Sequence, residues 1–420
     1  MKKITSGVCA PKGFMAGGIR CGIKPGSQKN DLSLIYSNEF CSAAAMFTEN
    51  KVKAASVLVS QENIANGKLR AVIANSGNAN ACTGKQGLDA ARRMANLIAD
   101  ELSIAPSEVA VASTGVIGVQ LPIEKIEKNI SALKTSLRSD EAGHSAALEA
   151  IMTTDTRKKD IAVEIEIDGK PVRIGAMAKG SGMIHPNMAT MLGFITTDAA
   201  ITPYALDLSL RCAVKKSFNR LTVDGDTSTN DMVVIMANGK AQNKPVIGHY
   251  GLGIGDTGSY LKDKDFNVFN EALEYVCVEL TRMMARDGEG ATKLVTVTVS
   301  GSGSEEKAEL LAKSVASSSL VKAACFGADA NWGRVLCAMG YAGADFDPSK
   351  VSVSFKSRAG EIQVCSEGQT VPFSEEKAKE ILSQEEIEIL ILLSEGSHKA
   401  TVWGCDLTYD YVKINGDYRS

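Results

Sequence analysis

Two predicted regions of the chain meet at one stretch, Lys179-Gly180-Ser181-Gly182-Met183-Ile184-His185-Pro186-Asn187-Met188-Ala189-Thr190-Met191-Leu192-Gly193-Phe194. It is rich in glycine, then apolar, and it carries no formal charge after Lys179. Gly180 and Gly182 permit backbone angles that are closed to other residues, and Pro186 fixes another. The composition therefore predicts a loop held on a strained path, followed by a strand that begins near Thr190.

A β-hairpin is predicted to lead into this stretch. Apolar residues alternate with charged ones over 163–167, Asp168-Gly169 supplies a two-residue turn, and the alternation continues to 174. Before the hairpin, the apolar spacing over 88–102 predicts a helix that begins near Gly87, and 109–111 reads as a short buried strand. The first part of the chain thus mixes helices and strands.

A second lobe with the same mixture is predicted from Thr190 onward. The pattern predicts a long amphipathic helix over 269–283, a strand over 295–299 and a hairpin from 351 to 364, while 313–324 fits one helix of small residues. The run 248–258 is the most loop-like of the chain. The fold class is therefore α/β or α+β, with antiparallel strand pairs and two lobes.

Size and charge narrow the class of protein. A chain of 420 residues exceeds what one hydrophobic core usually organises. The formal net charge is −3, and no Lys/Arg-rich run could neutralise several phosphates, so nucleic acid is not expected as a partner. The N-terminus does not read as a secretory signal, and no segment reaches the ~20 apolar residues of a membrane span. We expect a cytoplasmic protein.

Cysteine and histidine usage predicts neither disulfides nor a metal site. The ten cysteines contain no CxxC pair, which in a chain of this length favours reduced, mostly buried thiols. The four histidines lie far apart in the sequence, and none has the spacing of a zinc motif. No metal is expected.

Thr190 is the candidate nucleophile. In a strained loop, a threonine hydroxyl can attack the carbonyl carbon before it, and hydrolysis of the resulting ester leaves a chain that begins with that threonine. Its free α-amine, with an ordinary pKa of roughly 7.7–8.0, can then act as base for its own hydroxyl without a histidine. Taken without further information, the residues favour an ordinary threonine at the start of a strand over a nucleophile.

Several motifs, in a fixed order, resemble the ornithine acetyltransferase family, also called glutamate N-acetyltransferase of the arginine pathway. The resemblance spans nearly the whole chain and includes the self-cleavage site at 179–192. The other matching segments are 113–118 (Ser-Thr-Gly-Val-Ile-Gly), 153–156 (Thr-Thr-Asp-Thr), 223–231 (Val-Asp-Gly-Asp-Thr-Ser-Thr-Asn-Asp), 286–293 (Arg-Asp-Gly-Glu-Gly-Ala-Thr-Lys), 327–334 (Gly-Ala-Asp-Ala-Asn-Trp-Gly-Arg) and 411–420.

The resemblance implies a role for each matching site residue. Cleavage between Ala189 and Thr190 would give an α chain of 1–189, the N-terminal lobe, and a β chain of 190–420, the C-terminal lobe, with Thr190 as nucleophile. Thr114 and Gly115 match the oxyanion hole, whose donors stabilise charge on the attacked carbonyl oxygen. The remaining matches are substrate contacts, to which Thr190 also belongs: Thr153, Lys179, Glu289, Asn415 and Ser420.

The resemblance also implies the reaction and the assembly. The acetyl group passes from N2-acetyl-L-ornithine to Thr190 and then to L-glutamate in a ping-pong cycle, without metal or organic cofactor. Acetyl-CoA as a second donor is left open. The implied fold is a layered sandwich of the ornithine acetyltransferase or DmpA-like type, and the implied assembly is a heterotetramer of two α and two β chains. The alternatives are a self-cleaving aminopeptidase or amidohydrolase and a non-catalytic binding protein.

Other segments admit a structural interpretation. The segment 223–231 holds three acids but lacks the glutamate of a twelve-residue Ca²⁺ loop, so it is interpreted as a turn network near the site. The Gly-x-Gly-x-x-Gly match at 253–258 has no strand before it and is rejected as a dinucleotide motif. The asparagines and the glycine of segment 75–81 could supply a catalytic amide, but their tendency to form turns explains them equally well. Lys179 could be a solvated loop lysine, and Glu289 could end a helix.

Overall fold

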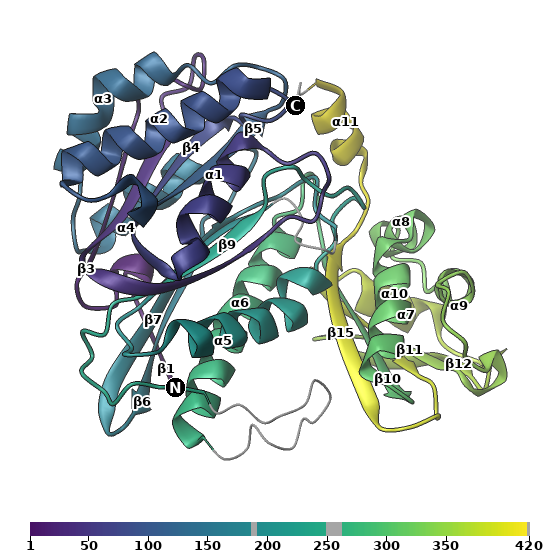
Figure 1. The fold of residues 1–420 in the computed structure, drawn as a ribbon. Helices are drawn as coiled ribbons and strands as arrows, with labels where there is room; N and C mark the ends of the chain where they lie inside the picture. Colours follow the sequence, from purple (N-terminus) through teal and green to yellow (C-terminus); the bar gives the residue numbers. More distant parts are fainter. Residues whose placement is uncertain (186–190, 249–262, 418–420) are drawn as a thin grey trace.

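The computed structural model describes residues 1–185, 191–248 and 263–417, which form two lobes (Figure 1). The larger lobe is built on a nine-stranded sheet. Eight strands follow the order β1-β6-β7-β8-β9-β3-β4-β5, and β2 pairs with β3 beside this path. The strands are β1 (Lys2–Ile4), β2 (Phe14–Ile19), β3 (Leu32–Phe47), β4 (Lys68–Asn78), β5 (Val109–Val116), β6 (Lys159–Ile167), β7 (Lys170–Lys179), β8 (Leu192–Thr197) and β9 (Met232–Ala237).

The long strand β3 joins two halves of this sheet. Its register to β4 shifts between Tyr36 and Cys41, and beyond that point it also pairs with β9. Side chains from β7, β8 and β9 share one core with side chains from β2, β4 and β5, among them Met177, Phe194 and Val72. The two halves therefore pack on each other as layers, and α4 (Glu141–Ile151) contributes to the same core.

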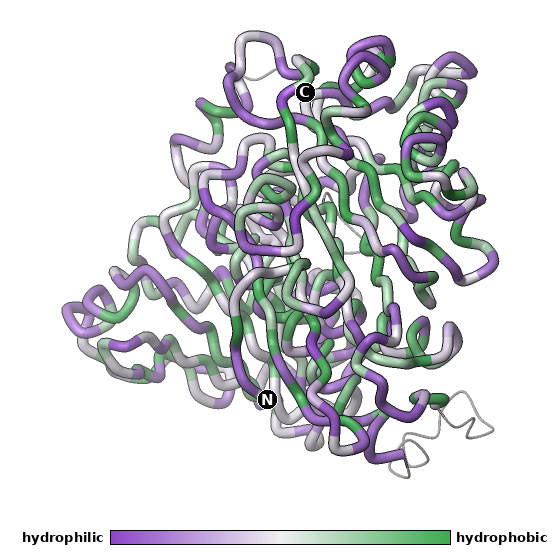
Figure 2. Tube along the Cα trace, turned by 90° about the vertical axis from the view of Figure 1, so that its left-hand side faces the viewer, coloured by the Kyte–Doolittle hydropathy of each residue, from purple (hydrophilic) through white to green (hydrophobic). Residues whose placement is uncertain are grey.

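Helices cover the outer faces of both halves. Helices α5 (Pro203–Lys216) and α6 (Lys264–Arg286) share a core with β6 to β9, whereas α2 (Gly84–Leu102) and α3 (Ile123–Thr135) share one with β3, β4 and β5. Helix α1 (Ala55–Asn63) lies beside α2, and α11 (Tyr409–Asp417) returns to this lobe from the far end of the chain (Figure 1). The hydrophobic stretches run mainly along the inner strands (Figure 2).

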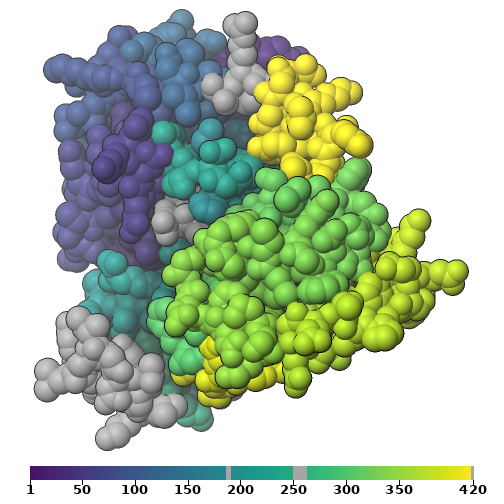
Figure 3. Space-filling view, turned by 90° about the vertical axis from the view of Figure 1, so that its right-hand side faces the viewer, coloured from purple at the N-terminus to yellow at the C-terminus, as the bar shows by residue number. Residues whose placement is uncertain are grey.

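The smaller lobe is a six-stranded sheet with helices on one face. The strand order is β13-β12-β11-β14-β10-β15, and the helices share one core with it. Figure 3 shows this lobe standing out from the larger one, with α11 above it. Its elements are β10 (Leu294–Ser302), α7 (Glu305–Ser317), α8 (Ser319–Phe326), α9 (Trp332–Gly340), β11 (Ser352–Ser357), β12 (Gly360–Ser366), β13 (Gln369–Thr370), α10 (Glu375–Leu382), β14 (Glu386–Leu392) and β15 (His398–Cys405).

Local sequence explains where several elements turn or end. Asp168 and Gly169 both have positive φ, at 52° and 67°, as a two-residue hairpin turn requires, so the β6–β7 hairpin is confirmed. The predicted single helix over 313–324 is wrong. Ser318 has an extended backbone and its side chain accepts the Val321 amide, so α7 ends there and α8 begins.

The lobes seen in the two sheets do not divide at residue 190. Strands β8 and β9 follow that position in the sequence, yet they lie inside the first sheet, between β7 and β3. The change of sheet falls between β9 and β10. The α chain of 1–189 and the β chain of 190–420 therefore stay a prediction about cleavage, separate from the division into lobes.

Thiols and helices fit the sequence expectations. All ten cysteines are free, and six of them are buried. Helices α2 and α6 enclose the two predicted amphipathic segments, and α2 begins three residues before Gly87. Among the described residues, we find no helix with the length and apolar character needed to cross a membrane.

Candidate active site

Segments far apart in the sequence meet at one small cavity of about 90 Å³ in the larger lobe. Strand β5 brings Thr114 and Gly115, the end of β7 brings Lys179, and the turn after α6 brings Glu289. The cavity is also lined by Ile117, Thr153, Thr154, Ser181, Gly182, Met183, Ser228, Asn230 and Asn415. Six residues whose roles were implied by the resemblance thus lie around one space: Thr114, Gly115, Thr153, Lys179, Glu289 and Asn415.

Lys179 is buried rather than solvated. Its side chain comes from the last residue of β7, and Nζ donates to Thr114 Oγ1 at 2.9 Å and to Thr153 Oγ1 at 3.4 Å. Burial lowers the pKa of Lys179, while the charge of Asp155 raises it. The interpretation as a solvated loop lysine is therefore wrong. A buried ammonium linked to two hydroxyls can bind a carboxylate or an oxyanion.

Gly115 occupies a position that only glycine fits. Its φ is 132°, and a Cβ built on it would lie 2.4 Å from the carbonyl carbon of Gly77 on the neighbouring strand β4. Thr114, beside it, is buried and its Oγ1 accepts a hydrogen bond from Lys179 Nζ, so its own hydroxyl hydrogen is free to point elsewhere. A hydroxyl and a backbone amide are thereby held side by side at the end of a strand.

Glu289 and Asn415 form the part of the cavity built by the C-terminal helix. Asn415 Nδ2 donates to Glu289 Oε2 at 2.9 Å, and the Glu289 amide donates to the Ser181 carbonyl at 2.8 Å. Gly182 allows this approach, because a Cβ there would lie 2.4 Å from the Glu289 carboxyl carbon. Helix α11 thus supplies a side chain to the cavity, although it follows the smaller lobe in the sequence.

A buried ionic cluster behind the cavity was missed by the sequence reasoning. Lys159 Nζ lies 2.6 Å from Asp155 Oδ1 and 2.5 Å from Asp287 Oδ2, and all three side chains are at most 2% exposed. Asp155 accepts the amides of Thr153 and Gly180 at 2.9 and 2.8 Å. The available signal was the Asp155–Lys159 spacing of four residues. Their distant partner Asp287 has no local signal.

Asp287 extends this cluster to the turn that carries Glu289. Its carboxylate accepts the amides of Thr156 and Arg157 at 3.1 and 3.2 Å and also the Thr156 hydroxyl. The cluster therefore ties the segment of Thr153, the end of β7 and the turn after α6 to one another.

The segment 223–231 is a turn network, as predicted. Asp224 accepts the amides of Met183 and Ile184 at 2.6 and 2.9 Å. Asn230 Nδ2 donates to the carbonyls of Ala79 and Ser113, which links this segment to the ends of β4 and β5. Asp224 therefore holds one side of the stretch 179–194, and Asp231 holds the other by accepting the Met191 amide.

Some predicted residues lie outside the described residues. They are Ala189, Thr190 and Ser420, together with the rejected glycine motif at 253–258 and most of the loop-like run 248–258. Within the described ranges, no group of three or more His, Cys, Asp or Glu side chains is placed to hold a metal ion.

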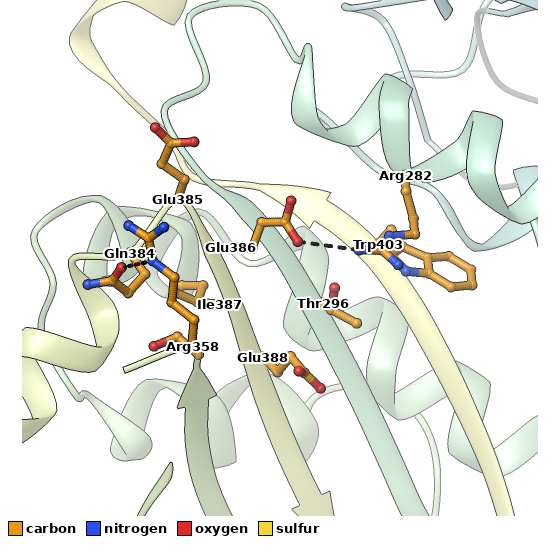
Figure 4. Close-up of a pocket in the computed structure, with 10 residues that line it drawn as sticks. Arg282, Thr296, Arg358, Gln384, Glu385, Glu386, Ile387, Glu388 and Trp403 are labelled. Carbon is orange, nitrogen blue, oxygen red and sulfur yellow. Dashed lines mark hydrogen bonds and ion pairs between the residues drawn. The ribbon is translucent and has the colours of Figure 1, made fainter. Parts of the chain in front are cut away.

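A larger cavity of about 390 Å³ lies between Arg282 of α6 and the sheet of the smaller lobe (Figure 4). Within it, Arg358 donates a hydrogen bond to the Gln384 side chain at 2.6 Å, and Arg282 pairs with Glu386 at 3.3 Å. It contains none of the residues that the motifs single out. The smaller cavity is therefore the candidate active site.

The fold and this cavity define an acyltransferase. A buried lysine, a hydroxyl with a neighbouring glycine amide and a carboxylate surround one space at the end of the strand that precedes Thr190. Comparison with known proteins agrees: the ArgJ family model matches residues 15–420. The chain belongs to the ArgJ family, and the predicted two-lobed layered sandwich is confirmed.

Relatives match over nearly their whole length. The arginine biosynthesis bifunctional protein ArgJ of Caldanaerobacter subterraneus subsp. tengcongensis is 49% identical, covering 98% of each chain. The glutamate N-acetyltransferase of Methanothermobacter thermautotrophicus is 48% identical, covering 100% of this chain and 98% of its own. A crystal structure of the bifunctional ArgJ protein of Bacillus halodurans is 41% identical over 55% of this chain and 100% of that chain, with a TM-score of 0.49.

Proposed function

We propose that this enzyme transfers an acetyl group from N2-acetyl-L-ornithine to L-glutamate through an acetyl ester on Thr190, as a glutamate N-acetyltransferase of arginine biosynthesis. The observation that carries the proposal is the meeting of Thr114, Gly115, Lys179 and Glu289 around one cavity. Relatives about half identical to this chain bear the names glutamate N-acetyltransferase and bifunctional ArgJ. The same evidence favours a transferase over an aminopeptidase or amidohydrolase.

The oxyanion hole consists of the Thr114 hydroxyl and the Gly115 amide. Lys179 donates to Thr114 Oγ1, so the hydroxyl hydrogen of Thr114 points away from Lys179 and can meet a negatively charged oxygen. The ammonium of Lys179 also stabilises that charge, because it is buried where water screens little. Each such donor is worth about 2.7–4 kcal/mol of the barrier.

Glu289 recognises the donor substrate. N2-acetylornithine carries a free side-chain ammonium, and a half-buried carboxylate is a suitable partner for it. Asn415 fixes the orientation of that carboxylate through one oxygen and leaves the other for the substrate. Thr153 and Ser420 complete the substrate contacts.

The cycle has two half-reactions. Thr190 Oγ attacks the acetyl carbon and gives its proton to the Thr190 α-amine, the bond from carbon to the ornithine nitrogen breaks, and that nitrogen leaves with the proton. The amine of glutamate then attacks the ester carbon, the Thr190 oxygen leaves, and a proton returns to it. Both half-reactions use one oxyanion hole, and neither needs a cofactor.

The mature enzyme consists of an α chain of 1–189 and a β chain of 190–420, two of each, and works in the cytoplasm. Whether acetyl-CoA also serves as a donor is decided by a donor panel.

Intact-mass analysis combined with a donor panel tests the proposal. We expect two fragments that divide before Thr190, and acetylation of glutamate from N-acetylornithine, with acetyl-CoA as the second donor in the panel. Thr190→Ala is expected to remain one 44.4 kDa chain without transfer, and Thr190→Ser to retain some of both. Release of acetate without acetylation of glutamate would identify a hydrolase, and an uncut wild type without turnover would identify a binding protein.

A further inference from the structure

Three buried asparagines surround the strand ends that carry the proposed oxyanion hole, and the mechanism above gives them no task. They are Asn75 and Asn78 at the end of β4 and Asn230 in the turn network before β9. Each is at most 4% exposed. Asn75 and Asn78 belong to the segment 75–81, for which the sequence left a catalytic amide and turn formation equally open.

The pairing between β4 and β5 becomes irregular where the proposed oxyanion hole lies. The two parallel strands pair residue for residue as far as Gly77 and Gly115, and beyond that point Asn78 lies opposite both Thr114 and Val116. A bulge of this kind takes one residue out of the regular ladder and changes the direction of its backbone groups. Gly115, whose amide is one of the two proposed donors, is that residue.

Asn230 links the ends of both strands. Its Nδ2 donates to the carbonyl of Ala79, directly after β4, at 2.6 Å and to the carbonyl of Ser113 in β5 at 2.8 Å. Its Oδ1 accepts the Thr229 hydroxyl at 2.5 Å, which fixes the orientation of the amide. Asn230 lines the cavity, but both of its N–H groups are occupied, so the amide has no donor left for a substrate.

Asn75 holds the same residue of β5 through its side chain. Ser113 Oγ donates to Asn75 Oδ1 at 2.7 Å, and Asn75 Nδ2 donates to the Asn78 carbonyl at 2.9 Å. The hydroxyl and the carbonyl of Ser113 are therefore both anchored by amides. Because the peptide bond is planar, a fixed Ser113 carbonyl also fixes the nitrogen and Cα of Thr114.

We propose that Asn230 is a positioning residue for acetyl transfer, which holds the ends of β4 and β5 so that the Thr114 hydroxyl and the Gly115 amide stay side by side at the cavity. This inference rests on the proposed function. Asn230 does not touch the acetyl group and acts through the Ser113 carbonyl. Its loss weakens the stabilisation of the transition state, in which the oxyanion forms, and leaves substrate binding nearly unchanged.

The test compares kcat and KM for acetyl transfer, with the activity of each variant divided by the amount of cut chain from intact-mass analysis. Asn230→Ala removes both bonds to the carbonyls. We expect kcat to fall about tenfold to a hundredfold, and KM for N-acetylornithine to change less than about threefold. Asn230→Ser is the milder variant, because its hydroxyl can still donate to one carbonyl, and its kcat should lie between the two. Wild-type kcat in both variants would overturn the proposal.

Asn243→Ala is the matched control. Asn243 is also buried, and its Nδ2 donates to the carbonyls of Ala200 and Lys244 at 3.0 and 2.7 Å. None of these three residues lines the cavity. Asn243→Ala should lower the melting temperature much as Asn230→Ala does, but keep the wild-type kcat. An equal fall of kcat in both variants would show a general loss of packing and overturn the positioning role.

Thr114→Val tests whether Asn230 acts through the oxyanion hole. Valine keeps the shape of threonine and removes the hydroxyl. In that background Asn230→Ala should lower kcat by a smaller factor than in the wild type, because residues that act through one site are not additive. Equal factors would overturn the proposal. An unchanged kcat in Thr114→Val itself would overturn the proposed oxyanion hole, whereas a loss in Thr114→Val but not in Asn230→Ala would overturn the positioning role alone.

Discussion

Replacement of Lys159 by methionine tests whether the buried cluster behind the cavity holds the site together. Methionine fills nearly the same volume but removes the cation that pairs with Asp155 and Asp287. Breaking a buried ion pair from one side typically costs 3–5 kcal/mol, because a buried charge loses its partner. Here two carboxylates lose it, and we expect about 3–5 kcal/mol of destabilisation or more.

The pH dependence of this loss has a definite sign. Burial alone would raise the pKa of Asp155, but the charges of Lys159 and Lys179 outweigh it and bring the pKa to about 2. A lowered folded-state pKa stabilises the protein above the unfolded-state pKa, and this stability is lost as the pH falls through the folded value. Wild type and Lys159→Met should therefore differ most near neutral pH and converge between about pH 5 and pH 2.

Urea denaturation of each variant in the Thr190→Ala background keeps one uncut chain in the measurement. The control is Lys85→Met, since Lys85 pairs with Asp89 at the same 2.6 Å but is 87% exposed. Exposed pairs contribute about 0–1 kcal/mol. If Lys159→Met shifted the midpoint no more than Lys85→Met does, the cluster would not have the structural role assigned to it.

Three further changes test single contacts. Gly115→Ala places a Cβ 2.4 Å from the Gly77 carbonyl carbon at a φ of 132°, so kcat should fall by about 10²–10³ if the oxyanion hole is displaced, as steady-state kinetics will measure. Glu289→Gln keeps the contact with Asn415 but loses the charge, so KM for N-acetylornithine should rise about tenfold or more while KM for glutamate changes less; equal changes would contradict the assigned contact. Burial raises the pKa of the fully buried Asp231 well above its ordinary value. Asp231→Asn should therefore raise the melting temperature at neutral pH and not near pH 3, because a raised folded-state pKa costs stability as the pH rises above the unfolded value; a gain at both pH values would contradict the raised pKa.

Local signals predicted the elements that depend on local sequence. The apolar spacing over 88–102 found α2, and Asp168-Gly169 found the β6–β7 hairpin, because period and turn chemistry act within a few residues. The boundary between α7 and α8 was missed, since Ser318 looks like any other small residue until its backbone is seen to be extended.

Pairings between distant segments were not predictable in this way. The sixteen-residue β3 is buried over much of its length, so its apolar and polar residues do not alternate in the simple way that predicts a strand. Its shift of register depends on its pairing with two different strands, β4 and β9. Lys159 and Asp287 lie 128 residues apart. The roles of Thr114, Lys179 and Glu289 came from the family resemblance, and only the fold shows that they share one cavity.

The position of the proposed cut within the sheet explains how the enzyme can lose a peptide bond and keep its site. Strand β7 pairs antiparallel with β8, β8 pairs parallel with β9, and β9 pairs with β3. Two strands of the proposed β chain are therefore enclosed by strands of the proposed α chain. The proposed cut lies in the connection from β7 to β8, so it removes no hydrogen bond between the strands of the sheet. Asp231 still accepts the amide of Met191. The proposed cut thus leaves the described strand pairing intact and supplies the free amine beside a hydroxyl that the proposed reaction needs.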